Sequence, residues 1–118
     1  MMHTETTISF AKETFLDLKL TKKRYAEIKE ELTYNEHILK ECSSWSKWLS
    51  DEFRKNVHID IEVEGVMQNV LLDEAIVTLT KIVDGLREDL RYTKRQQELL
   101  TGLIAELTKV FPDVENEL

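Results

Sequence analysis

Residues 57–72 change the rhythm of this sequence, because they alternate apolar and polar side chains between two long segments with helical spacing. In the first half of this segment apolar residues occupy every second position, which places them on one face of a β-strand. A turn at Glu64 and Gly65 would return the chain along this strand with a second apolar face, in which only Gln68 is polar. The alternation therefore predicts a two-stranded β-hairpin at about 57–72.

The turn at Glu64 and Gly65 leaves two arrangements open. A two-residue turn there aligns Val63 with Val66. Glu is unfavourable at the first central position of a type I′ turn, so a longer loop with a bulge at Gly65 is the competing arrangement and would shift the register of the strands.

The segment after the hairpin repeats apolar residues at alternating steps of three and four, which is the seam of a coiled coil. Only Thr93 and Gln97 interrupt it. Asp73 can cap the first turn, and Pro112 ends the helix because the residue before a proline avoids helical dihedral angles. We predict a helix at about 74–111. Its seam contains Ile76, Leu79, Val83, Leu86, Leu90, Leu100, Ile104, Leu107 and Phe111.

The segment before the hairpin has neither Gly nor Pro from residue 1 to 64, and it also shows heptad spacing. We predict a helical region at about 8–55, with a possible break near Thr21 or at Ser43 and Ser44, because these side chains can cap a new helix. The seam of this region reads Leu18, Thr21, Tyr25, Ile28, Leu32, Asn35, Leu39, Cys42, Ser46, Leu49 and Phe53.

Together the segments predict a mainly α-helical single domain over residues 1–118. Its architecture is a long antiparallel, coiled-coil-like helical hairpin with the short β-hairpin between the helices and an acidic tail at 112–118. An isolated two-stranded ribbon is marginal in water, and several apolar helix positions exceed what one seam can bury. The chain is therefore expected to be oligomeric, as a homodimer or larger. The alternative is that the N-terminal segment folds back as a third helix. The surplus positions are Phe10, Leu16, Leu20, Ile38, Trp45, Trp48, Leu99 and Leu103.

Antiparallel pairing that is symmetric about the turn makes two predictions about the helices. It places Asn35 level with Thr93 and Gln97, so that the polar breaks in both seams meet in one layer that fixes the register. It also brings Glu36 near a basic group of the second helix that includes Arg87.

The net charge of −7 is unevenly distributed. The segment 57–80 contains five carboxylates and no Lys or Arg, and three more carboxylates lie in the segment 110–118. Such surfaces repel phosphate backbones, so nucleic acid is not an expected partner. No apolar run approaches the roughly 18 residues of a membrane span, the N-terminal residues lack the pattern of a leader, and the single Cys42 fits a reducing compartment. We expect a cytoplasmic protein without a membrane partner.

Residues with catalytic or metal-binding potential are isolated from suitable partners. Cys42 occupies a seam position, where a thiol is usually an inert core side chain. His37 and Glu41 lie four positions apart on a helix and supply only two of the three or four ligands that a metal needs. The alternate carboxylates of the hairpin would lie about 7 Å apart along the strand, too far to close around one calcium ion. We predict no enzymatic activity, no cofactor and no metal.

Two groups of residues are candidates for binding another protein. Asp60, Glu62 and Glu64 share the polar side of the hairpin, without a neighbouring cation in the sequence, and would suit a partner with a basic surface. Trp45 and Trp48 belong to an aromatic stripe that is wider than a two-helix seam requires, and tryptophan is a typical interface anchor. The alternative roles are protection of the strand edges for the carboxylates and packing against a second chain for the tryptophans.

The order of a helix, a central hairpin around EVEGVMQNVLLDEA and a second coiled-coil helix resembles the layout of prefoldin-type chaperone subunits, which are similar in length and often acidic. The resemblance concerns layout, so it implies a role for no particular residue. From the sequence we expect a non-catalytic protein-binding protein, acting as a regulator, inhibitor or assembly factor on a self-associating helical scaffold. The alternatives are a prefoldin-like holdase chaperone and a small structural protein of a larger assembly.

Overall fold

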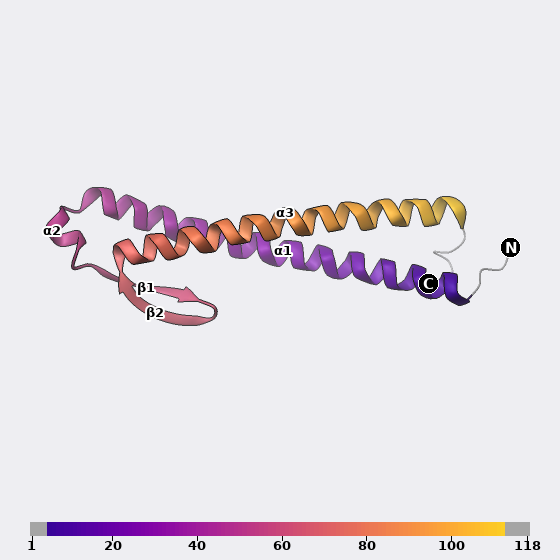
Figure 1. Ribbon diagram of the computed structural model, residues 1–118, viewed down its shortest axis with the longest axis horizontal. Coiled ribbons are helices and arrows are strands. Elements are labelled where there is room, and N and C mark those ends of the chain that lie inside the picture. The colour runs from indigo at the N-terminus through magenta and orange to yellow at the C-terminus, as the bar shows by residue number, and fades with distance from the viewer. Residues whose placement is uncertain (1–4, 113–118) are drawn as a thin grey trace. The chain divides into compact units, whose positions relative to one another are not determined.

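The computed structural model describes residues 5–112, apart from the side chain of Thr7. The acidic tail predicted at 112–118 therefore lies almost wholly outside the described residues. Two long helices enclose a short helix and a hairpin in the order of the chain (Figure 1). The elements are α1 (Glu5–Trp48), α2 (Asp51–Arg54), β1 (His58–Val63), β2 (Val66–Leu71) and α3 (Leu72–Val110). They form two compact units: a central unit, residues 29–88, and a terminal unit made of the described parts of 1–28 and 89–118.

The hairpin has the predicted position and the predicted register. β1 and β2 are antiparallel, with Val63 opposite Val66, and a two-residue turn connects them. Both turn residues have positive φ, 52° at Glu64 and 79° at Gly65, as a type I′ turn requires. The competing bulged loop is therefore absent, and Glu64 adopts a left-handed conformation that is unfavourable for its side chain.

The first helical region is interrupted before residue 55. α1 ends at Trp48, Ser50 is extended (φ −64°, ψ 157°), and the chain resumes as the single turn of α2. The break thus follows the serine pair that was predicted to cap a new helix. Ser44 instead donates its hydroxyl to the Lys40 carbonyl one turn earlier, at 3.0 Å, so its side chain is compatible with a continuing helix.

α3 begins without any linker after β2. The backbone N–H of Leu72 donates to the Val57 carbonyl at 2.9 Å, which extends the hairpin ladder by one bond into the first residue of the helix. Asp73 consequently lies inside the first turn of α3 rather than before it, where its negative charge is still favourable at the helix N-terminus.

The core of the central unit lies between the hairpin and the two long helices. Ile61 is 3% exposed and contacts a cluster that includes Cys42 of α1 and Leu72 of α3. Full burial of one such aliphatic side chain contributes about 1.5–3 kcal/mol, so this cluster supplies the support that an isolated hairpin lacks. Ala75 and Leu79 complete the buried set, and Ile38, Leu39, Leu49, Val57, Ile59, Val63, Val70 and Ile76 pack around it.

The terminal unit has a thinner core. Its fully buried side chains are small or polar, namely Ala11, Thr14 and Thr93, together with Ile28. Thr14 donates its hydroxyl to the Phe10 carbonyl at 2.8 Å, so burial of this group leaves no unsatisfied donor. Larger apolar side chains of both helices remain exposed beside this core.

The helices of the central unit are paired in a register that differs from exact symmetry about the turn. The predicted proximity of Glu36 and Arg87 is confirmed by their ion pair in the central unit, at 3.7 Å. Exact symmetry about the turn would instead place Thr93, six positions after Arg87, level with Glu36. The buried amide of Asn35 donates to the Glu31 carbonyl of its own helix at 2.8 Å. The polar layer of Asn35 with Thr93 and Gln97, which would join residues of the two units, stays a prediction. The shift of about two turns arises because residues 49–57 form a joint on the α1 side that has no counterpart between β2 and α3.

Candidate protein-binding site

The outer face of the hairpin carries the predicted acidic group. Because the inner face packs on the core, His58, Asp60 and Glu62 of β1 point away from it, and all three are exposed. Asp60 accepts a hydrogen bond from the side-chain amide of Asn69 on β2, Nδ2 to Oδ1 at 2.9 Å. Glu64 is exposed in the turn. The structure thus places Asp60 and Glu62 on the outer face of β1 and Glu64 in the adjoining turn, so all three predicted carboxylates are exposed on the hairpin.

The same face also has an apolar component that the sequence analysis missed. Met67 lies opposite Glu62 and is 63% exposed, and the half-buried Leu71 lies opposite His58. The predicted pairing of the strands already places Met67 and Leu71 on the outer face of β2. Both residues could therefore have been found from the sequence. A surface with carboxylates and a methionine can combine charge attraction with apolar contact.

The carboxylates of this face are not neutralised by a nearby cation. Among residues 5–112 no ion pair involves Asp60, Glu62 or Glu64. The cations that precede the hairpin in the sequence are Arg54 and the exposed Lys55. Arg54 is directed elsewhere: its Nη2 lies 2.7 Å from Asp51 Oδ1 and its Nε lies 3.8 Å from Asp73 Oδ1. The negative potential of the hairpin therefore persists at the surface.

The predicted aromatic residues form a second exposed group, near the joint between α1 and α2. Trp45 is 51% exposed and Trp48, the last residue of α1, is 88% exposed. Phe53 of α2, also 66% exposed, extends this group. Within residues 5–112 no hydrogen bond or ion pair joins this aromatic group to the acidic hairpin face.

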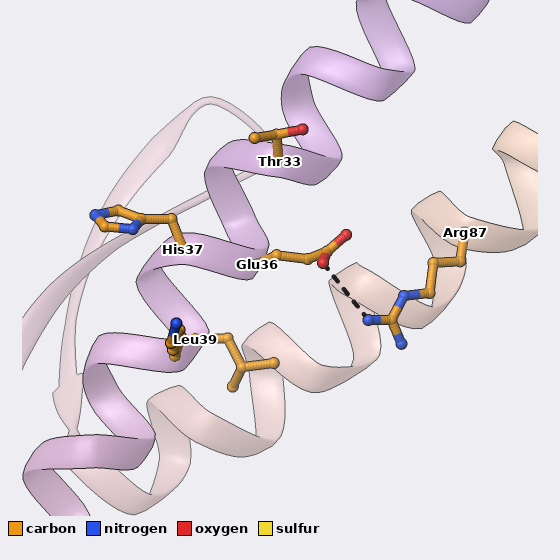
Figure 2. A pocket seen from close by; sticks show the side chains of 6 residues that line it. Thr33, Glu36, His37, Leu39 and Arg87 are labelled. Atoms are coloured by element: carbon orange, nitrogen blue, oxygen red, sulfur yellow. Dashed lines mark ion pairs between the residues drawn. The ribbon is translucent and has the colours of Figure 1, made fainter.

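The residues with catalytic or metal-binding potential lie on α1. Cys42 is buried, and the pKa of its thiol is raised, chiefly because burial desolvates the thiolate and secondarily because Glu41 is negative. His37 Nε2 lies 3.2 Å from Glu41 Oε1 on the surface of α1. Figure 2 shows that His37 and Arg87 point in different directions although they line one shallow hollow of about 420 Å³. In the part of the chain that the structure describes, no group of three potential ligands is arranged for a metal.

A groove in the terminal unit was not predicted. It has a volume of about 320 Å³ and lies between α1 and α3. Leu16 and Leu20 of α1 are each 54% exposed, and Leu20 lines the groove. Leu99 (59% exposed) and Leu103 (39% exposed) follow the lining residues of α3 by three positions and so lie on their side of the helix. The lining residues are Asp17, Leu20, Thr21, Arg24, Gln96 and Leu100.

These elements define the class of the fold. It is mainly α-helical, and a two-stranded antiparallel hairpin follows the first long helix and precedes the second along the chain. None of the helices within residues 5–112 is long and apolar enough to cross a membrane. Comparison with solved structures finds the crystal structure of the prefoldin beta subunit from Thermococcus strain KS-1. The match has a TM-score of 0.67 and 19% sequence identity, and it covers 97% of this chain and 90% of that chain. The predicted fold, a coiled-coil hairpin, is confirmed by this similarity. Neither protein-family models nor curated proteins match the sequence.

Proposed function

We propose that this chain is a non-catalytic subunit of a protein-binding assembly and that it holds non-native polypeptides as a prefoldin-like holdase chaperone. The carrying observation is the set of exposed leucines beside the groove of the terminal unit, Leu16, Leu20, Leu99 and Leu103. Packing within the chain leaves all four of these apolar side chains exposed, so they are available to an apolar segment of another polypeptide. The fold shared with a prefoldin beta subunit favours this function over that of a regulator or a small structural protein.

Shallow apolar surfaces suit a holdase better than an enzyme. An unfolded polypeptide offers many different apolar side chains, and a rigid deep pocket would select only a few of them. The groove of about 320 Å³, flanked by flexible leucine side chains, can accept varied segments through weak apolar contacts. We place this activity in the cytoplasm, where the buried Cys42 would remain a reduced thiol.

Assembly is proposed to use the hairpin. In a two-stranded sheet each strand leaves one edge unpaired, and these edges can pair with hairpins of other copies or related chains. The inner face is held on the helices by Ile61, so the hairpin is presented in a fixed orientation within the central unit. An assembly would place several grooves around one client and raise the effective affinity of weak contacts.

The test of the holdase is suppression of aggregation. A chemically unfolded enzyme is diluted into buffer, and light scattering is followed with increasing amounts of this protein. We expect suppression near equimolar ratios, and we expect Leu99→Gln with Leu103→Gln to weaken it several-fold. Met67→Gln, which removes an exposed apolar side chain from the hairpin, is the matched control. If the wild-type protein leaves scattering unchanged at tenfold excess, the holdase proposal is wrong.

A second candidate function is binding of one folded partner with a basic surface, and the unneutralised carboxylates Asp60, Glu62 and Glu64 favour it. Clustered negative charge accelerates encounter with a basic protein in a salt-dependent manner. Affinity capture from the native host should then return one stoichiometric partner. Replacing the three carboxylates by Thr should weaken the complex and remove its salt dependence, whereas Trp45→Ala with Trp48→Ala tests the aromatic surface separately.

A further inference from the structure

We infer that the groove of the terminal unit also binds a second copy of this chain, groove against groove and antiparallel, and that this docking covers the four exposed leucines. The inference goes beyond the holdase function, because it names a different occupant of the surface, and it does not require that function to be correct. It is also distinct from assembly through the hairpin, which lies in the other unit.

The apolar part of this surface is suited to pairing with itself. Leu20 and Leu100 line the groove from α1 and α3. Leu16, one turn before Leu20, is exposed on α1, and Leu99 and Leu103 are exposed beside Leu100 on α3. Two such faces placed together would give an arrangement of four helices, in which the exposed leucines of each copy pack between the leucines of the other.

The charges of α1 select the antiparallel orientation. Asp17 and Arg24 both line the groove, on opposite sides of Leu20 along the helix. They are seven positions apart, so they lie on the same face of the helix. A two-fold axis perpendicular to the helices at the level of Leu20 lays α1 against α1 of the copy. Asp17 of each chain then lies opposite Arg24 of the other.

The charges of α3 independently select the same axis. Arg95 precedes Leu99 by four positions and Glu106 follows Leu103 by three, so opposite charges bracket the leucines on this helix too. Because Leu20 and Leu100 line one groove, the midpoints of both charge pairs are level. One axis therefore brings Arg95 onto Glu106 of the copy while it brings Asp17 onto Arg24.

The four charged side chains that form these proposed pairs have no ion-pair partner within the described chain. Among residues 5–112 no ion pair involves Asp17, Arg24, Arg95 or Glu106, and all four are exposed. A parallel arrangement would lay α1 against α3 of the copy without bringing these opposite charges together. One turn beyond Asp17 and Arg24, Glu13 would approach Glu27 of the copy, which opposes association and keeps it modest.

Charge exchange tests the orientation. Asp17→Arg gives a groove with two arginines, and Arg24→Asp gives a groove with two aspartates. We expect each variant alone to self-associate about tenfold more weakly than the wild type in sedimentation analysis. An equimolar mixture should recover association, because every arginine then meets an aspartate of the other chain. Glu30→Lys, an exposed charge on α1 in the other unit, is the control and should behave as wild type. Failure of the mixture to recover association, with both variants still helical, would overturn the inference.

Cross-linking locates the axis without relying on charge. In a Cys42→Ala background, Leu20→Cys places a thiol next to the axis, and mild oxidation should join two chains through it. Phe10→Cys lies in the same unit, but its thiols would be about 30 Å apart along the antiparallel helices and should not cross-link. Equal cross-linking of the two variants would contradict the antiparallel pairing. Aggregation suppression is measured separately on the same samples, so loss of the holdase and loss of this dimer are distinguishable results.

Discussion

Arg54 connects α2 to the start of α3 through Asp73, with Nε 3.8 Å from Oδ1, while its Nη2 donates to Asp51 at 2.7 Å. The Arg54 Nε is buried and has no hydrogen-bond partner, so proximity to the Asp73 carboxylate is its main electrostatic compensation. This arginine holds the joint that α2 forms between α1 and the hairpin.

Removing this side chain should loosen the joint. Arg54→Ala is expected to lower the free energy of unfolding by about 1 kcal/mol, because it loses a charge-assisted hydrogen bond and a half-buried ion pair that solvent partly screens. Lys55→Ala, which removes the exposed cation next to it, should change stability little. Urea denaturation followed by circular dichroism measures both, and equal effects would show that Arg54 has no special role.

The turn of the hairpin predicts two opposite changes in stability. Gly65 has φ 79° and open space around its Cα, so Gly65→Ala should cost about 1–2 kcal/mol for conformational reasons alone. Glu64 has φ 52°, where Asn is better tolerated, so Glu64→Asn should stabilise by up to about 1 kcal/mol. Thermal unfolding of both variants checks the signs; stabilisation by Gly65→Ala would mean that the turn is not left-handed.

Asn35 lies buried in the seam of α1 with its amide bonded to its own helix. Leucine at this position would increase the buried apolar area. It would leave no hydrogen-bond donor of another helix without an acceptor, because the side-chain amide of Asn35 bonds within α1. Asn35→Leu should therefore raise the free energy of unfolding by about 1 kcal/mol. Tyr34→Leu, at an exposed neighbouring position, should be nearly neutral. A destabilised Asn35→Leu protein would reveal a polar contact of Asn35 beyond α1.

Cys42 predicts a loss of stability at alkaline pH. Burial raises the pKa of its thiol above the ordinary value of 9.0, so the folded chain retains this proton at pH values where the unfolded chain has lost it. The stability contribution is constant well below pH 9 and decreases as the pH rises past that value, by up to about 1.4 kcal/mol per pH unit. Denaturation at pH 7.5 and pH 10 should show a larger decrease for the wild type than for Cys42→Ala. The same burial should make alkylation of Cys42 slow in the native protein.

The hairpin was predictable to the residue because two independent signals agreed. Alternation indicated which side chains face inward, and Gly65 indicated where the chain reverses, so the pairing of Val63 with Val66 was one of only two arrangements to consider. The acidic residues Asp60, Glu62 and Glu64 followed from the same alternation. The outward placement of Asp60 and Glu62 is therefore a direct consequence of strand geometry, whereas Glu64 is exposed in the turn.

The pairing of the helices could not be predicted in this way. Heptad spacing identifies the face that is buried but not the residue that lies opposite, and the joint at residues 49–57 shifts one helix along the other. Nothing in the local sequence around Leu49 and Ser50 marks the end of α1 strongly, since neither Gly nor Pro occurs there. The groove of the terminal unit was missed for the same reason, because its lining depends on which residues of α1 and α3 are level.

The hairpin is connected more tightly to α3 than to α1, and the bond from the Leu72 N–H to the Val57 carbonyl is part of the connection to α3. On the α3 side, β2 passes into the helix without a linker, so a force applied to the hairpin is transmitted directly along α3. On the α1 side, the single turn of α2 and the extended Ser50 lie between the hairpin and the helix, and this joint would deform before α1 does. Strain that a bound partner exerts on the hairpin would therefore be felt along one helix and absorbed before it reaches the other.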